Sequence, residues 1–385
     1  MKKILVLVGT YFPYGVAISS RMLNFCRLFR DAGFHVHVIA MHSADKDILP
    51  GAVYERENIH YQIVTDKSPS SKESFIGSQV FITECDNYLS SNNVEFVFMT
   101  SLTAMYKRIR KIIMAHKVRY FVEQCEWLDV SAYKFGYLDL RMLRASHLRK
   151  HGFYHPNGVV SISRLLDDYY KSINVRSIRI PTILDIQNTD CPVWKKRDHK
   201  IHLIFAGTLG TKEQMAPIIG ALANNKFLRE NIQFDIYGPT KNMILKNLGK
   251  DAGFLDKAGT SVVVHDRIPQ EQMSAVYAQS DFLIFLRPAR RSSNAGFPTK
   301  LAESMSVGTP VITNDTGDIS LFLENEHNGF LLSENTLEAV ANCFTKIIAL
   351  EDGRYAQLRL ASRLTAEQYF DYRVYSQALI DFCSS

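Results

Sequence analysis

The chain of 385 residues lacks the sequence features of several protein classes. None of its six cysteines stands in a Cys-x-x-Cys pair, so neither a zinc ribbon nor a dithiol redox motif is indicated. No apolar run reaches the roughly 18 residues of a membrane-spanning helix. The first apolar run, 4–8, stops at Gly9 and Thr10 without a small-residue cleavage site, which favours a buried strand over a signal peptide.

The chain also lacks a large net charge. The 45 Lys and Arg against 39 Asp and Glu leave a net charge of +6, which permits an anionic partner but requires none. Hydrophobic content of 46% and charged content of 22% are those of a globular protein and exclude a disordered chain. At about 150 residues per domain, this length predicts two domains. Scattered cysteines fit a reducing cytoplasm, which is the location we expect.

Short apolar runs alternate with helical patterns along both halves of the chain. The runs are 4–8, 36–39, 96–99, 120–122 and 158–162, followed after residue 200 by 201–206, 232–237, 262–264, 282–286 and 311–312. The amphipathic stretches include 17–32, 102–117 and 213–224. Because the apolar runs are continuous rather than alternating, they predict parallel strands covered on both faces. Their alternation with helices predicts an α/β fold with right-handed crossovers and doubly wound, Rossmann-like sheets.

A polar segment over 187–200, with a proline and a charge cluster, is typical of a linker. We therefore expect one Rossmann-like domain over 1–186 and a second over 200–365, with a cleft between them. The remaining residues, 366–385, are aromatic-rich and predict a C-terminal helix that could pack back on the first domain.

The most informative segment is 281–317, in which an expected strand is followed by the polar loop 287–294 and a helix. Pro298 suits the first helical turn, and Gly308 is a natural stop. Lys300 lies in the first turn, where a cation opposes the helix dipole, so we expect an anionic partner. Glu303 is one turn further on, and its two oxygens match a ribose diol. The alternative is a solvated Lys–Glu pair.

Two glycine loops follow expected first strands. In the second half, Gly207-Thr208 leads to Lys212, whose charge would accompany backbone N–H groups around a phosphate. In the first half, the loop 9–15 ends at Gly15, where backbone can approach a ligand closely, and precedes the helix with Arg21. Each loop could instead be an ordinary strand–helix connection.

These three segments in this order resemble the retaining nucleotide-sugar glycosyltransferases of family 4, which have the GT-B fold. The resemblance covers nearly the whole chain, and its specific part is the block from Gly296-Phe297-Pro298 to Gly308-Thr309-Pro310. The segments 158–163 and 123–127 are similar to those of members that build bacterial exopolysaccharide, capsule or lipopolysaccharide.

The resemblance implies roles for particular residues. Lys212 would bind the diphosphate, and Glu303 would be the second glutamate of an E-x7-E motif and hold the ribose. Gly296 and Phe297 would present backbone to the donor, and Gly15 would approach the pyrophosphate. The implied function is transfer of a sugar, with retention, from a nucleotide-sugar to a glycan or lipid-linked acceptor. UDP is the first expectation for the donor nucleotide and GDP the second.

Two positions depart from the family pattern. Ala295 stands where the first glutamate of E-x7-E is expected, and Thr208 stands where an arginine is common. Lys300, Arg290 or Arg291 could supply the missing charge, and Ser293 or Asn294 could bind a sugar hydroxyl. By position alone, Tyr237 and Arg267 could line the nucleobase pocket.

No metal or other cofactor is expected. The only Asp-x-Asp spacing, Asp45-Lys46-Asp47, lies in a polar loop of the first domain and is read as a solvated loop. Lysines and helix N-termini would then stabilise the leaving diphosphate. The alternatives are a GT-B epimerase or phosphorylase, a non-catalytic sugar-nucleotide binder, and a nucleic-acid-binding protein. The last has no supporting motif, so no nucleic-acid partner is expected.

The first domain is expected to bind the acceptor. Glu123 and Glu126 follow a strand near the expected cleft, and one of them would orient the acceptor hydroxyl; a capping or salt-bridging role is the alternative. Arg21 is also expected to bind the acceptor. The stretches 103–119 and 141–155 are rich in Lys and Arg and contain no acid. They predict either a peripheral contact with anionic lipid at the inner face of the plasma membrane or a solvated basic face.

Overall fold

A computed structural model describes residues 2–45, 47–65, 77–193, 199–210 and 212–385. The chain divides into two compact units. The first contains Met1–Leu184 and Tyr372–Ser385, and the second contains Asp185–Asp371. Among the described residues, no helix has both the length and the hydropathy to cross a membrane.

The first unit is built on an eight-stranded sheet in the order β3-β4-β2-β1-β5-β6-β7-β8. Its strands are β1 (Lys3–Tyr11), β2 (His35–His42), β3 (Val53–Arg56), β4 (Ile59–Ile63), β5 (Val94–Thr100), β6 (Arg119–Gln124), β7 (Gly158–Ser161) and β8 (Ser177–Arg179). All neighbours pair in parallel except β3 and β4. The core strand β1 places Ile4 beside Val36 on one side and Phe96 on the other.

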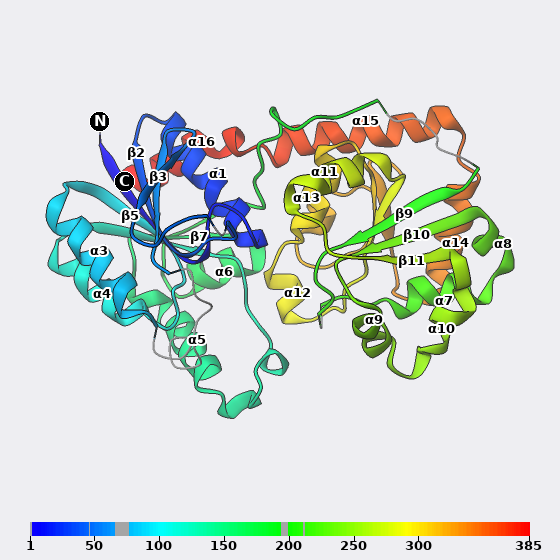
Figure 1. Cartoon of the computed structure of the whole chain (residues 1–385), viewed down its shortest axis with the longest axis horizontal. Helices are drawn as coiled ribbons and strands as arrows, with labels where there is room; N and C mark the ends of the chain where they lie inside the picture. The colour runs from blue at the N-terminus through cyan, green and yellow to red at the C-terminus, as the bar shows by residue number, and fades with distance from the viewer. Residues whose placement is uncertain (1, 46, 66–76, 194–198, 211) are drawn as a thin grey trace. The chain divides into compact units, whose positions relative to one another are not determined.

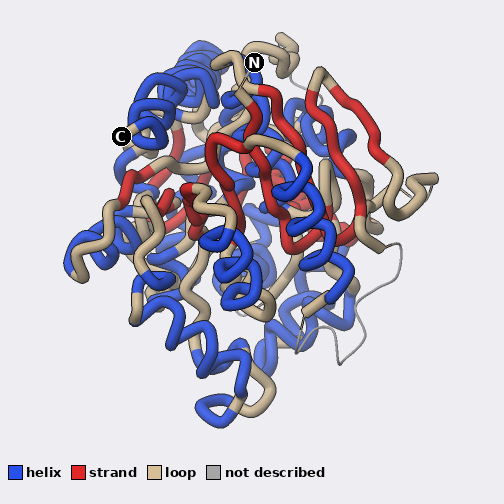
Figure 2. The backbone as a smooth tube through the Cα atoms, turned by 90° about the vertical axis from the view of Figure 1, so that its left-hand side faces the viewer, coloured by secondary structure: helices blue, strands red, loops and turns tan. Residues whose placement is uncertain are grey.

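Helices cover both faces of this sheet. They are α1 (Ala17–Asp31), α3 (Gln79–Ser91), α4 (Tyr106–Ala115), α5 (Leu140–Lys150), α6 (Arg164–Ser172) and α16 (Ser376–Ser384). α1 and α16 lie together on one face, and α3 and α4 on the other (Figure 1). Right-handed crossovers produce this arrangement, since the chain leaves β1 toward β2 and later runs from β5 the opposite way. Figure 2 shows the strands of this unit side by side between its helices.

The second unit has a six-stranded, all-parallel sheet in the order β11-β10-β9-β12-β13-β14. Its strands are β9 (Ile201–Ala206), β10 (Ile232–Tyr237), β11 (Val262–His265), β12 (Phe282–Ile284), β13 (Val311–Asn314) and β14 (Gly329–Leu332). Its helices are α7 (Ala216–Asn224), α8 (Lys226–Asn231), α9 (Lys241–Leu248), α10 (Gly253–Ala258), α11 (Gln270–Gln279), α12 (Arg291–Ala295), α13 (Thr299–Ser306), α14 (Leu337–Ile348) and α15 (Asp352–Tyr369).

The prediction of two doubly wound α/β sheets is confirmed. The sequence analysis missed β3, β4, β8 and β14, which are only three to five residues long and lie at or next to the edges of the two sheets. It was also wrong in expecting continuous helix after 366: α15 ends at Tyr369, and α16 begins only at Ser376. The helix stops where Asp371 accepts the backbone amides of Ile186 and Gln187, at 3.1 and 3.3 Å.

The expected linker over 187–200 begins as a fixed segment. The Arg363 guanidinium of α15 donates to the carbonyl of Ile186 at 3.0 Å and to that of Thr189 at 3.2 Å. Residues 194–198 of that linker lie outside the described residues. Residues 372–385 are part of the first unit, where Phe382 packs against Phe121 with ring centroids 5.8 Å apart.

Candidate functional site

The second sheet reverses its strand order at β9. The chain runs from β9 through β10 to β11 on one side and returns to β12 on the other, so the carboxyl ends of β9 and β12 flank a topological switch point. Ligands of open α/β sheets bind at such points. Gly207 follows β9 with a φ of +124°, and its amide donates to the Tyr237 carbonyl at 3.1 Å. At Gly238, a Cβ would lie 2.8 Å from the Gly207 carbonyl oxygen, so backbone packs against backbone here.

Three charged side chains gather at this switch point. Lys300 Nζ lies 3.4 Å from Glu213 Oε1, and the Arg287 Nε lies 4.0 Å from the same oxygen. The side chains of Lys300, Glu213 and Arg287 are 12%, 8% and 8% exposed. Two cations therefore share one carboxylate in a place largely closed to water.

Lys300 is the central group of this cluster. Its Nζ sits 4.0 Å from the Phe205 ring centroid and 5.5 Å from that of Phe285, on the two strands that flank the switch point. Burial lowers the pKa of Lys300; Glu213 opposes that shift, and the Arg287 charge adds to it. Because Lys300 is in the first turn of α13, the helix dipole also disfavours its charge. An anion at this point would relieve both effects.

The backbone at Arg287 is fixed by amide side chains. Asn314 at the end of β13 accepts the Arg287 amide at 2.8 Å and donates to its carbonyl at 2.9 Å. Asn335 donates to the same carbonyl at 2.7 Å and to Gln214 Oε1 at 2.8 Å. These bonds tie the loops after β9, β12, β13 and β14 together, so the charged cluster sits on a rigid base.

Glu303 lies one turn along α13 from Lys300. It accepts a long hydrogen bond of 3.5 Å from the Tyr277 hydroxyl, and Gln270 also donates to it. Burial raises the pKa of Glu303, while the nearby Lys300 charge lowers it. The carboxylate is thus oriented by α11 and within electrostatic reach of Lys300.

Other expected donor residues are placed less centrally. Lys212 is half-buried in the loop after β9, while Thr208, Arg267 and Arg290 are exposed. Tyr237 stacks on His265, with ring centroids 4.3 Å apart and planes inclined by 6°.

The segment between α12 and α13 is buried. Phe297 turns its ring into an aromatic cluster, 5.4 Å from Phe322 and 5.7 Å from Phe370. Gly296 is buried beside it, and Pro298 is the N-cap of α13. The side chain of Phe297 therefore belongs to the core, and only backbone is left to meet a ligand.

The position of the missing glutamate is closed. Ala295 is fully buried in α12, so solvent does not reach this position. Asn294 next to it accepts the Gly317 amide at 3.0 Å. The hydroxyl of Ser293, also fully buried, has no hydrogen-bond partner in the part of the chain that the structure describes.

Sequence reasoning missed Glu213 and Arg287. Glu213 directly follows Lys212, and Arg287 is the first residue after the apolar run 282–286. The position of Arg287 could have indicated a site residue, because the residue after a buried parallel strand lies at the ligand-binding edge of the sheet. The partner of Lys300 could not be found in this way, since 87 residues separate Glu213 from it.

In the first unit, Arg21 and Glu123 pair with each other. Arg21 Nε lies 2.7 Å from Glu123 Oε1, and the side chains are 4% and 1% exposed. The Arg21 guanidinium also donates to the carbonyls of Pro181 and of Ile180, the latter at 2.8 Å. Burial raises the pKa of Glu123, and Arg21 opposes that shift. This pair joins α1, β6 and the chain after β8; an acceptor role for it stays a prediction.

Gly15 has a φ of +124°, and an added Cβ would lie 3.1 Å from Tyr11 Cβ, so the loop after β1 requires glycine there. Asp45 accepts the Asp47 amide at 3.0 Å and both side chains are exposed, while Lys46 between them lies outside the described residues. Within the described ranges, no group of three or more His, Cys, Asp or Glu side chains is arranged to hold a metal ion.

The two basic stretches meet at Tyr154. Lys107 and Arg110 of α4 lie 6.0 and 5.2 Å from its ring centroid, and His147 of α5 contacts its hydroxyl at 2.9 Å. Glu126 is exposed beyond β6. The fold thus joins charges that are more than 30 residues apart in the sequence into one basic surface.

Comparisons with known proteins agree with this architecture. Residues 187–364 match the family model described as "Glycosyl transferases group 1". A D-inositol 3-phosphate glycosyltransferase of Xylanimonas cellulosilytica is 25% identical over 184 residues, which cover 46% of this chain and 41% of that relative. The chain thus aligns with less than half the length of this curated relative.

Solved structures resemble the entire chain. A sucrose-phosphate synthase of Thermosynechococcus elongatus superposes with a TM-score of 0.75 at 15% identity, with full coverage of both chains. Anabaena Alr3699/HepE, in complex with UDP and glucose, superposes with a TM-score of 0.73 at 13% identity, again with full coverage. At these identities the likeness shows the fold, and it confirms the predicted GT-B class.

The buried pair in the first unit leads to a stability prediction. We expect Arg21→Ala to lower the free energy of unfolding of the first unit by about 3–5 kcal/mol, because Glu123 is left charged and buried without a partner. Urea denaturation followed by Trp127 fluorescence in a Trp194→Phe background measures this change.

The loss of unfolding free energy in a Glu123→Gln, Arg21→Met double variant should be smaller than the sum of the losses in the single variants Glu123→Gln and Arg21→Met. Unchanged stability in Arg21→Ala would show that the pair contributes nothing to folding.

Proposed function

We propose that the protein is a retaining glycosyltransferase. It would move a sugar from a nucleotide-sugar, first of all a UDP-sugar, to a hydroxyl of a glycan or lipid-linked oligosaccharide in bacterial surface polysaccharide synthesis. The observation that carries the proposal is the buried cluster of Lys300, Arg287 and Glu213 at the switch point of a unit that matches the group 1 glycosyl transferases. The cluster suits the diphosphate of a sugar nucleotide.

Charge develops on the diphosphate as the anomeric C–O bond breaks. Cations in a site largely closed to water stabilise that charge more than they would in bulk solvent. Lys300 is placed in such a site, with Glu213 holding its amino group, and Lys212 on the loop after β9 would add a second amino group. We infer that these groups act in place of a metal ion.

Retention implies attack on the face from which the leaving group departs. The acceptor oxygen would form the new bond to the anomeric carbon, and its proton would pass to an oxygen of the leaving phosphate. Such a reaction needs no pair of carboxylates of the hydrolase type. Glu303, oriented by Tyr277, would instead hold the ribose hydroxyls.

The comparisons support the choice of donor. Two solved structures that share this fold are complexes with UDP: HepE with UDP and glucose, and a Staphylococcus aureus TarM variant with UDP and glycan ligands. The closed position at Ala295 favours one competing function, a sugar-nucleotide binder without transfer activity. Incubation with UDP-sugars and an acceptor mixture separates the two, since a binder releases no UDP.

Substitutions in the cluster should remove activity. We expect Lys212→Ala, Lys300→Met and Glu303→Ala each to lower kcat/KM for transfer by roughly 100-fold or more, as for loss of a group that stabilises transition-state charge. Release of UDP measures the rate. Lys226→Ala, in which the removed side chain is 80% exposed on α8, is the control and should be unaffected. Near-normal turnover of Lys212→Ala and Glu303→Ala would refute the donor-site assignment.

Donor binding should weaken at alkaline pH. Because burial lowers the pKa of Lys300, its charge is lost at a lower pH than that of an ordinary lysine. The increase in Tm that a UDP-sugar causes should therefore shrink as pH rises through this lowered pKa. Lys300→Arg, which stays charged, should keep the increase.

The same assay at neutral pH compares UDP-, GDP- and dTDP-sugars, and a selective increase in Tm identifies the base. If Lys300→Arg loses the UDP-sugar-induced increase in Tm at alkaline pH to the same extent as the wild type, the titration of Lys300 is not the cause of that loss.

We further propose that the first unit contacts an anionic membrane surface. Phe135, Tyr137 and Leu138, which lie between β6 and α5, are 65%, 75% and 84% exposed. This segment extends from the body of the first unit in Figure 1. Lys134 precedes it, and the basic surface of α4 and α5 is on the same unit. Apolar side chains beside basic ones suit the boundary between lipid headgroups and acyl chains.

Liposome flotation tests the membrane contact. The protein should float with vesicles containing phosphatidylglycerol and not with phosphatidylcholine alone, and a Phe135→Ser, Leu138→Ser variant should lose most of this binding. Leu364→Ser, on α15 of the second unit with a side chain 53% exposed, is the matched control. Equal flotation with neutral and anionic vesicles would exclude the electrostatic contact.

A further inference from the structure

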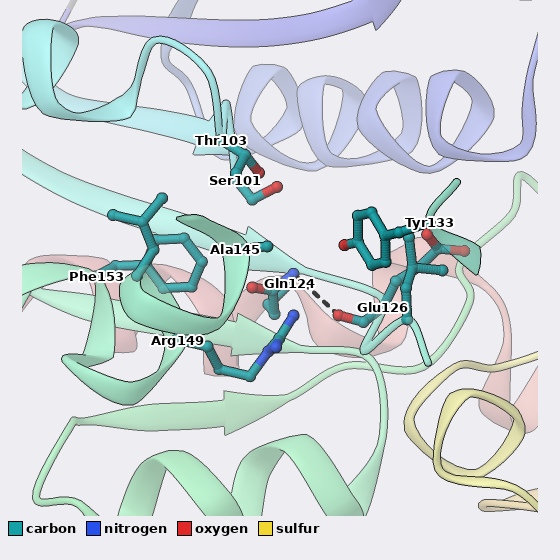
Figure 3. Close-up of a pocket in the computed structure, with 10 residues that line it drawn as sticks. Ser101, Thr103, Gln124, Glu126, Tyr133, Ala145, Arg149 and Phe153 are labelled. Atoms are coloured by element: carbon teal, nitrogen blue, oxygen red, sulfur yellow. Dashed lines mark hydrogen bonds between the residues drawn. The ribbon is translucent and has the colours of Figure 1, made fainter. Parts of the chain in front are cut away.

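The first unit contains a pocket that the donor chemistry does not use. It lies at the carboxyl ends of β5 and β6, next to the point where the first sheet reverses its strand order, and has a volume of about 220 Å³ (Figure 3). It is lined by Ser101, Thr103, Gln124, Glu126, Leu128, Tyr133, Ala145, Leu148, Arg149 and Phe153. Sites for drug-sized ligands measure roughly 300–1,000 Å³, so this pocket suits a group of about one sugar ring rather than a nucleotide.

Arg149 of α5 is the main charged group of the pocket. The residue is only 8% exposed, and its guanidinium lies 4.6 Å from the Trp127 ring centroid. Figure 3 shows this guanidinium directed toward Gln124 and the interior of the pocket. The Arg149 side chain also hydrogen-bonds with the Tyr170 hydroxyl. A guanidinium has five N–H donors in a planar fork, so it can bind an oxyanion in addition to such a hydroxyl.

Neutral polar groups line the same pocket as Arg149. The hydroxyls of Ser101, Thr103 and Tyr133 and the amide of Gln124 come from three different segments of the chain. Gln124 is held in place, because its Oε1 accepts from Tyr170 at 3.2 Å and its Nε2 donates to the Glu126 carbonyl at 3.5 Å. Hydroxyl and amide donors beside an arginine are the groups that bind carboxylate and phosphate oxygens.

The acidic group at the pocket restricts which anions fit. Glu126 is exposed and lines the pocket, as drawn in Figure 3, so a ligand that placed its negative charge there would be repelled. The negative group must therefore face Arg149, while neutral hydroxyls meet Glu126. A sugar with a single acidic substituent meets both requirements.

We propose that this pocket binds a saccharide through one oxyanion, a carboxylate or a phosphate, that pairs with Arg149. In the context of the proposed function, and resting on it, this saccharide is the acceptor or the acceptor's terminal sugar. The transferase would then select acidic over neutral glycans at the first unit. The donor cluster in the second unit takes no part in this selection.

Binding to the purified full-length protein tests the proposal. The probes are methyl β-D-glucuronide, methyl β-D-glucoside 6-phosphate and neutral methyl β-D-glucoside, titrated in a Trp194→Phe background so that Trp127 reports on the pocket. We expect at least one acidic probe to bind tenfold or more tighter than the neutral one and to change Trp127 fluorescence. Which acidic probe binds tells whether the carboxylate or the phosphate is recognised.

Variants link the preference to Arg149. Arg149→Gln should abolish the acidic preference, and Arg149→Lys, which keeps the charge but not the planar fork, should reduce it. Lys171→Gln, which removes one exposed charge from α6 of the same unit, should leave it intact. An unchanged increase in Tm with UDP-sugar in Arg149→Gln would show that the variant is folded.

Equal affinity for acidic and neutral probes, or an acidic preference that survives Arg149→Gln, would overturn the assignment. Wild-type protein that prefers acidic sugars but neither binds nor turns over nucleotide-sugars would refute the proposed function and leave the pocket assignment in place.

Discussion

Buried charge at the switch point of the second sheet is the feature that the proposed donor site requires. Lys300 is held between the rings of Phe205 and Phe285 and shares Glu213 with Arg287. Desolvation makes such a cluster costly unless each charge has a partner. The amide side chains that fix the loop at Arg287 keep these distances short. The hydrogen bonds that make the surrounding loops rigid therefore also fix the charged groups on which the chemistry of the site depends.

The first unit uses a buried ion pair differently. Arg21 and Glu123 are almost inaccessible to solvent and join three segments of the chain. The contacts observed for this pair are therefore with other parts of the same chain. Further along the chain, the buried Arg149 and the exposed Glu126 line a pocket beyond β6. One sheet edge thus carries a structural pair and a recognition pocket a few residues apart.

Much of the fold followed from local pattern, because strands buried on both faces must be continuously apolar. The fully buried Ile4–Val8 and Phe282–Leu286 are examples. The short edge strands, such as β8 and β14, escaped detection since their pairing comes from the neighbouring strand rather than from their own residues. The break after Tyr369 was missed for a similar reason: the Asp371 carboxylate beyond it accepts hydrogen bonds from backbone amides 184 and 185 residues away.

Within the site, local sequence pattern predicted the helix start that places Lys300 in a first turn and Glu303 one turn later, because helix geometry acts over three or four residues. It could not determine that Lys300 pairs with Glu213, that Arg21 is consumed by Glu123, or that Arg149 stacks on Trp127. Those contacts join residues 22 to 102 positions apart. Only the packing of helices on a sheet brings such residues within a few ångströms, and the burial and neighbouring charges that shift the pKa of Lys300, Glu303 and Glu123 arise there.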